Sequence, residues 1–193
     1  YRQLYGELLP IPADRVLLMA DGMRLQLGAR TFEFIDAPGH ARHHHCPIDL
    51  DHRDVYAGDN FGICYREFDT AAGPFMLPTT TPVHFEPAVL HRTIDRLLSY
   101  RPRRIVQTHF GPVTDLERLA RDLHADLEAL GVMSRRHAAA PDRARRIQHD
   151  MFEHFNSRLD AHGYAGSPAR RHEFIDEDVN LNTQGLEVWL SRQ

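Results

Sequence analysis

The first part of the chain alternates apolar and polar residues in short runs that predict strands. Such alternation places one face of a strand in a core and the other toward solvent. Residues 16–20 precede the pair Asp21-Gly22, which favours a hairpin turn into the next run. We expect further strands at residues 23–27, 32–36, 54–57 and 104–108.

Longer stretches in the second part have the 3.6-residue period of amphipathic helices. We expect helices at 86–100, 114–130, 141–161 and 178–191, and loops at 69–87 and 163–176. Thr114 and Gly131 are the expected N-terminal and C-terminal caps of the second helix.

The composition of the chain argues against several classes of function. The 193 residues are 42% apolar and 26% charged, which suits a globular protein with a hydrophobic core. A net charge of −4 without a basic block argues against nucleic acid and anionic membranes as partners. No apolar run approaches the roughly 20 residues of a membrane span. Cys46 and Cys64 are too few for a disulfide framework, so a cytoplasmic location is expected.

Three predicted strands end in turns that carry a metal-binding type of side chain. The turns hold His40, Asp59 and His109, and each turn contains glycine within two residues of that side chain. Loops at strand ends are where a rigid sheet best positions reactive groups. Imidazole and carboxylate suit zinc or iron, and one carboxylate can bridge two ions. The sequence therefore indicates a metal site at one end of a sheet.

The order of these turns resembles the later motifs of the metallo-β-lactamase superfamily. The motifs are Pro38-Gly39-His40, Gly58-Asp59 and Thr108-His109-Phe110-Gly111, and the resemblance covers about residues 14–132. It implies an α/β (α+β) fold, namely the second half of a four-layer αββα sandwich with extra C-terminal helices. It also implies two divalent metal ions, most commonly zinc, with iron or manganese as alternatives. His40 then binds the first ion, Asp59 bridges, and His109 binds the second.

The first motif of that family, His-x-His-x-Asp-His, is absent here. The run His43–His45 lacks its spacing and follows the Pro-Gly-His turn instead of preceding it. Only the second half of that fold is present, and its sheet alone would expose an apolar face, which soluble monomers rarely tolerate, so we expect a missing N-terminal half. It would be a preceding segment of the same protein, a cleaved fragment or a partner chain. We expect a C-terminal half-domain over residues 1–136 and a helical extension packed on it over residues 137–193.

The resemblance implies a metal-dependent hydrolase that uses a metal-bound hydroxide on a small-molecule substrate with an ester-like carbonyl, such as a thioester or lactone. Asp59 is the expected catalytic residue. The alternatives are an iron-dependent, oxygen-using redox enzyme and a non-catalytic binding or signalling module. His44 is either close to the cleft or in a solvated loop, and Tyr65, Arg66 and His84 are candidate pocket residues. The C-terminal helices pack on the body, cover the cleft as a lid, or form a homodimer contact.

Overall fold

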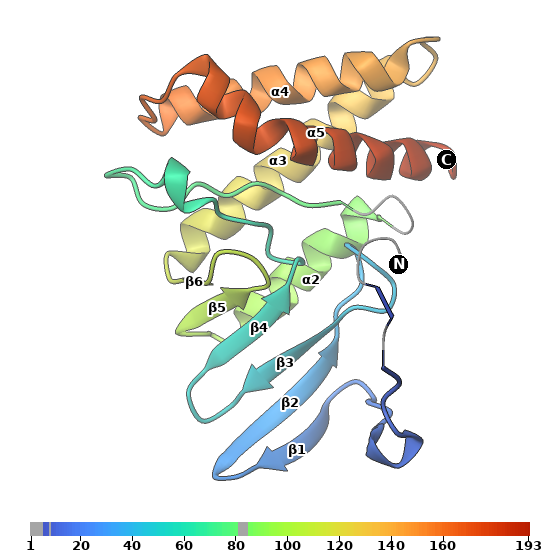
Figure 1. Cartoon of the computed structure of the whole chain (residues 1–193), viewed down its shortest axis with the longest axis vertical. Coiled ribbons are helices and arrows are strands. Elements are labelled where there is room, and N and C mark those ends of the chain that lie inside the picture. The colour runs from blue at the N-terminus through green and yellow to red at the C-terminus, as the bar shows by residue number, and fades with distance from the viewer. Residues whose placement is uncertain (1–5, 8, 81–84) are drawn as a thin grey trace.

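The computed structural model describes residues 6–7, 9–80 and 85–193, and its strands form one mixed sheet (Figure 1). The strands, in the order of the chain and of the sheet, are β1 (Met23–Leu27), β2 (Arg30–Asp36), β3 (His45–Asp49), β4 (Asp54–Gly58), β5 (Arg104–Gln107) and β6 (Pro112–Val113). β3 is antiparallel to β2 and β4, whereas β4 and β5 are parallel. The C-terminal ends of β2, β4 and β5 therefore lie at the same end of the sheet.

The described residues also form four helices. They are α2 (Pro87–Ser99), α3 (Leu116–His137), α4 (Arg143–Ala161) and α5 (Pro168–Leu190), with short turns η1 (Ala13–Arg15) and η2 (Arg66–Phe68). α2 contacts α3, and α3 contacts both α4 and α5, which contact each other. In Figure 1, α4 and α5 lie together beyond α3, far from β1.

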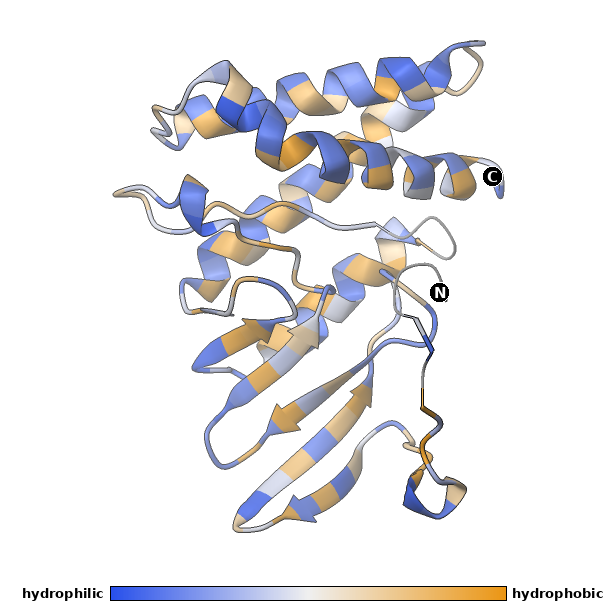
Figure 2. Cartoon of the chain, viewed as in Figure 1, coloured by the Kyte–Doolittle hydropathy of each residue, from blue (hydrophilic) through white to orange (hydrophobic). Residues whose placement is uncertain are grey.

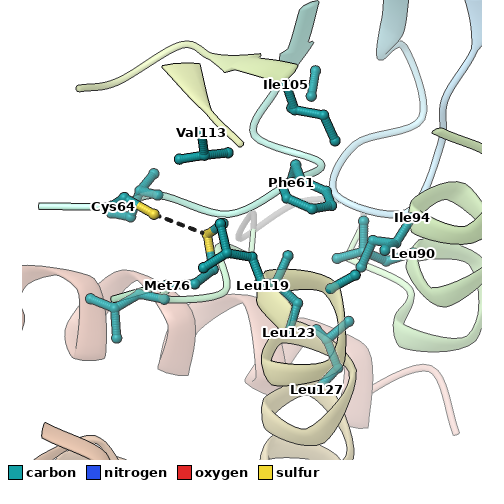
Figure 3. Close-up of a cluster of buried hydrophobic side chains, with 14 of the residues drawn as sticks. Phe61, Cys64, Met76, Leu90, Ile94, Ile105, Val113, Leu119, Leu123 and Leu127 are labelled. Atoms are coloured by element: carbon teal, nitrogen blue, oxygen red, sulfur yellow. Dashed lines mark hydrogen bonds between the residues drawn. The ribbon is translucent and has the colours of Figure 1, made fainter. Parts of the chain in front are cut away.

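The main core lies between one face of the sheet and helices α2 and α3. Figure 3 shows Phe61, Ile105 and Val113 facing apolar side chains of both helices, among them Leu90 and Leu123. These residues are almost completely buried. Burial of this apolar surface is the main driving force for folding.

The opposite face of the sheet is also apolar but only half-buried. It carries Phe34 and Pro47, which lie opposite each other, and Tyr56 and Val106, which are also paired. The colours of Figure 2 alternate along the strands because successive side chains point to opposite faces. An apolar face that stays half-exposed is typical of a surface that packs against another layer.

Most predicted strands are confirmed, and two differences have a physical reason. Residues 16–20 form no strand, because β1 pairs instead with β2 across the tight turn at Gly28 and Ala29. The expected hairpin around Asp21 is therefore wrong. β3 was not predicted, because the preceding histidines obscure a short strand in which only Cys46, Ile48 and Asp49 are buried.

The predicted helices exist, but several boundaries are wrong. α3 begins after Asp115, not Thr114, and runs through the buried Gly131 to His137. Tertiary packing thus overrides the C-cap signal of that glycine. α5 begins at Pro168 instead of residue 178, because the Ser167 hydroxyl accepts a hydrogen bond from the backbone N–H of Arg170 at its N-terminus.

No helix within the described ranges is long and apolar enough to cross a bilayer. The proposed boundary near residue 136 falls at the end of α3, where the chain turns toward α4. The division into a half-domain and a helical extension stays a prediction.

Candidate metal centre

The three predicted ligands come together at the C-terminal ends of β2, β4 and β5. His40 lies four residues beyond β2, Asp59 directly follows β4, and His109 lies two residues beyond β5. The Nε2 atom of His40 is 3.7 Å from Oδ2 of Asp59, and the Nε2 atom of His109 is 4.0 Å from Oδ1. Each carboxylate oxygen therefore faces a different imidazole.

Both distances lie within the span that one ion can bridge between two donors, and a tetrahedral ion would hold the donors closer, at about 3.4 Å. Metal–ligand bonds of about 2.0–2.2 Å let one ion join donors up to about 4.2 Å apart. Oδ1 of Asp59 is buried and has no hydrogen-bond partner among the described residues, which is costly unless a cation compensates it. Among the described residues, no three His, Cys, Asp or Glu side chains surround a single point as ligands of one ion. Each imidazole and the carboxylate oxygen that it faces form a separate pair of donors.

His40 is oriented by Thr79, a residue that the sequence did not single out. Its Nδ1 lies 3.2 Å from the Thr79 carbonyl oxygen and 3.1 Å from Oγ1. The Thr79 hydroxyl in turn donates to the backbone oxygen of Asp59 at 3.0 Å. Nδ1 therefore donates its proton to Thr79, and the Nε2 lone pair faces Asp59. Burial also lowers the pKa of His40, which favours the neutral imidazole that metal binding requires.

Gly39 allows the His40 turn to lie directly on α2. Its φ is +124°, and an added Cβ would lie 2.5 Å from the Leu90 backbone. The Gly39 carbonyl accepts from the N–H of Glu86 at 2.9 Å, and the Thr93 hydroxyl donates to Pro38 O at 2.5 Å. The turn is thus fixed to α2 by contact and by hydrogen bonds.

His44 lies close to the cleft, as one of the two sequence-based alternatives expected. Its ring centroid is 5.7 Å from that of His40, and its Nδ1 accepts from the Asn60 amide at 3.0 Å. Gly58 permits this approach, because an added Cβ would lie 2.2 Å from the His44 ring. His43 and His45 are exposed. His44 therefore supports the turn that carries Asp59.

His109 is the most accessible of the three candidate ligands, with 57% of its side chain exposed. Phe110 after it has a φ of +67°, an uncommon conformation for a residue with a side chain. Arg66 stabilises this loop, because its guanidinium donates to the Phe110 and Pro112 carbonyls at 2.9 and 2.8 Å. Arg66 thus holds the His109 loop and does not line the cavity.

A cavity of about 310 Å³ opens at the three candidate ligands, and α5 forms its opposite wall. Tyr65 lines it, as predicted, together with residues that carry no recognisable signal in the sequence: Thr79, Thr80, Glu177, Asp178 and Asn182. His84 lies outside the described residues. The C-terminal helix therefore packs on α3 and also lines one side of the cleft.

α5 also holds the segment that orients His40. Asn182 accepts from the N–H of Thr80 at 2.8 Å, and its amide donates to the Pro78 carbonyl at 2.9 Å. The Thr80 hydroxyl donates to the Asn182 carbonyl at 3.1 Å. Asn182 is 2% exposed. A polar side chain so deeply buried is usually satisfied by such bonds, and here they join α5 to the Thr79 turn.

We expect Asn182→Ala to lower the free energy of unfolding by about 1–3 kcal/mol, because it leaves two buried backbone groups without partners. Urea denaturation measures this effect. Asn180→Ala is the matched control, since Asn180 is exposed on the same helix, and it should change stability by less than about 0.5 kcal/mol. Equal losses in both variants would contradict this role of Asn182.

The two cysteines are unsuited to nucleophilic chemistry. Cys46 and Cys64 are fully buried and free. Burial raises the pKa of both thiols to about 12, so they stay protonated near neutral pH. Cys64 instead donates to the Met76 sulfur at 3.5 Å inside the core (Figure 3).

The chain was compared with known proteins by sequence and by structure. No family model and no curated protein sequence matches it. Solved structures do match. A metallo-beta-lactamase family protein of Thermus thermophilus has a TM-score of 0.59 at 18% identity, over 91% of this chain and 49% of that one.

Two further solved structures match this chain with similar TM-scores and similar coverage. A metallo-beta-lactamase superfamily protein of Sulfolobus tokodaii gives a TM-score of 0.59 at 19% identity, over 96% of this chain and 57% of that one. A beta-lactamase domain protein of Burkholderia ambifaria gives a TM-score of 0.62 at 19% identity, over 99% of this chain and 50% of that one. The chain thus spans about half the length of the structures it matches. Its mixed sheet, its covering helices and these matches show that the chain has the metallo-β-lactamase fold in part.

Proposed function

We propose that this chain supplies part of a two-metal centre in a hydrolase that acts on a small ester-like carbonyl. One observation carries the proposal: the two oxygens of Asp59 face different imidazoles, those of His40 and His109, at 3.7 and 4.0 Å. A single carboxylate in this position suits a bridge between two divalent ions, with zinc first and iron or manganese as alternatives.

The remaining features of the cleft support the same assignment. Among the described residues, the buried Oδ1 of Asp59 has no hydrogen-bond partner, and the Nε2 atom of His40 faces Oδ2 of the same carboxylate at 3.7 Å. A pair of bound ions would supply an activated hydroxide and polarise the substrate carbonyl. His40, Asp59 and His109 would fix their positions, while α5 limits access to the cavity. No protein nucleophile is needed in this chemistry.

We further propose that the half-exposed sheet face packs against a second half of the same fold. That half would contribute the His-x-His-x-Asp-His ligands and would be a segment of the same protein or a cleaved fragment. The apolar pairs Phe34–Pro47 and Tyr56–Val106 provide the surface for this contact. Purification of the protein from its source, followed by mass spectrometry, tests this idea. We expect the motif in the same polypeptide or in a tightly bound one.

The hydrolase proposal is tested on the intact protein by metal analysis and by turnover of a panel of esters. We expect about two equivalents of divalent metal, and hydrolysis that a chelator abolishes and added metal restores. Iron together with substrate-dependent oxygen consumption would instead favour the redox alternative. A stably folded protein that binds no metal and hydrolyses no ester would instead favour a non-catalytic binding module.

A further inference from the structure

One carboxyl group in the cleft takes no part in the proposed metal centre. Asp178 of α5 lines the same cavity as the three candidate ligands, on the opposite wall. Its Oδ2 accepts a hydrogen bond from the Tyr65 hydroxyl at 2.8 Å. Within the described part of the chain, this is the one hydrogen bond that its side chain makes. The other oxygen is therefore available to a molecule in the cavity.

Tyr65 holds this carboxyl in a defined place. Its ring contacts the rings of Phe68, Phe110 and Phe174, with centroid distances of 5.8, 4.7 and 5.4 Å. Aromatic packing on three sides restricts the ring to one orientation. Phe110 directly follows the candidate ligand His109, so the same cluster connects Asp178 to the metal-binding end of the sheet.

In the metal-free chain, burial shifts Asp178 toward its protonated form. Burial raises the pKa of this carboxyl from 3.8 to about 6, although the Tyr65 hydrogen bond opposes the shift. Of the charged groups nearby, Glu177 raises the pKa further and His109 lowers it. A carboxyl that titrates close to neutral pH can both give and regain a proton during turnover.

We propose that Asp178 is the general acid that protonates the leaving group, with Tyr65 as its positioning residue, and that the substrate is therefore an oxygen ester or lactone. This inference rests on the proposed hydrolase function. When the bond from the carbonyl carbon to the leaving oxygen breaks, its electron pair stays on that oxygen. The Asp178 proton moves to it and gives the alcohol. The carboxylate then regains a proton from the water that supplied the hydroxide.

The choice between leaving groups follows from their basicity. A thiol has a pKa of about 8.5 and leaves readily as the thiolate. An alkyl alcohol is closer to water, whose pKa is about 15.7, and its alkoxide leaves slowly unless it is protonated. A general acid typically accelerates such a step about 10²–10⁴-fold. A cleft with a positioned acid thus favours oxygen esters over thioesters.

Asp178→Asn tests this inference on the metal-loaded intact protein, with one acyl group presented as an alkyl ester, a nitrophenyl ester and a thioester. We expect kcat for the alkyl ester to fall at least about 30-fold, and kcat for the other two to change less than about threefold. Asp176→Asn is the matched control on the exposed side of α5, where Asp176 contacts His172, and it should leave all three rates unchanged.

A second readout does not depend on turnover. Carbon-13 NMR of the metal-free chain should show the Asp178 carboxyl titrating near pH 6, and Tyr65→Phe should raise that midpoint, because the hydrogen bond from Tyr65 lowers it. Equal slowing of all three substrates by Asp178→Asn, or titration near 3.8, overturns the acid role but leaves the hydrolase proposal intact. Absence of turnover with every substrate overturns both.

Discussion

Replacement of Asp59 by alanine should lower the zinc affinity of the intact protein by more than about 100-fold. Loss of a group that merely orients a ligand typically costs 10–100-fold, and a bridging ligand contributes to two ions at once. Asp59 is the residue whose two oxygens face both imidazoles. Isothermal titration calorimetry with zinc measures the affinity, and ester turnover should be lost together with the metal.

The control for this variant is Asp36→Asn. Asp36 is an exposed carboxylate at the end of β2, close to the His40 turn but without a side-chain contact to it. We expect its zinc affinity to stay within about threefold of the parent protein. Asp59→Ala with unchanged zinc affinity would remove the central support for the metal site, whatever its effect on turnover.

Replacement of Gly39 by alanine should destabilise the fold by about 3 kcal/mol or more. A φ of +124° is unfavourable for a residue with a side chain, and the new Cβ would lie 2.5 Å from the Leu90 backbone. Backbone strain of this kind costs about 1–2 kcal/mol, and overpacking adds about 1–3 kcal/mol. Because α2 must shift to relieve the contact, the His40 turn should move as well. Urea denaturation and zinc titration measure the two effects.

The variant Gly22→Ala separates the effect of backbone strain from the effect of the steric contact with α2. Gly22 also has a positive φ, +75°, but nothing lies within 4 Å of the position that a Cβ would occupy. We expect this variant to lose only about 1–2 kcal/mol, from backbone strain alone. If the two alanine variants were equally stable, the close contact between Gly39 and α2 would not contribute to the destabilisation.

Local patterns predicted much of the fold because they depend on neighbouring residues. Alternation along β1, β2, β4 and β5 and the helical period of α2 and α4 appear directly in the structure. The failures come where distant contacts decide. Gly131 remains inside α3 because the helix continues across the core, and residues 16–20 form no strand.

In the candidate site, too, some residues carry a local sequence signal and others depend on distant contacts. The turns at His40, Asp59 and His109 carry local signals, namely a metal-binding residue in a glycine-containing turn at a strand end. Thr79 carried no such signal, because its role depends on a hydrogen bond to a histidine 39 residues earlier. Asp178 and Asn182 were also missed, because their roles depend on hydrogen bonds to Tyr65 and Thr80, which lie 113 and 102 residues earlier.

The sequence by itself determined which residue types stand at the strand ends, and in what order. That was sufficient to predict the fold and the three candidate ligands. Only the tertiary structure decided that β2, β4 and β5 run in one direction, so that their turns meet, and that α5 closes the other side of the cleft. The physical reason is that strand direction and helix docking follow from burial of apolar faces between distant segments, which no local pattern encodes.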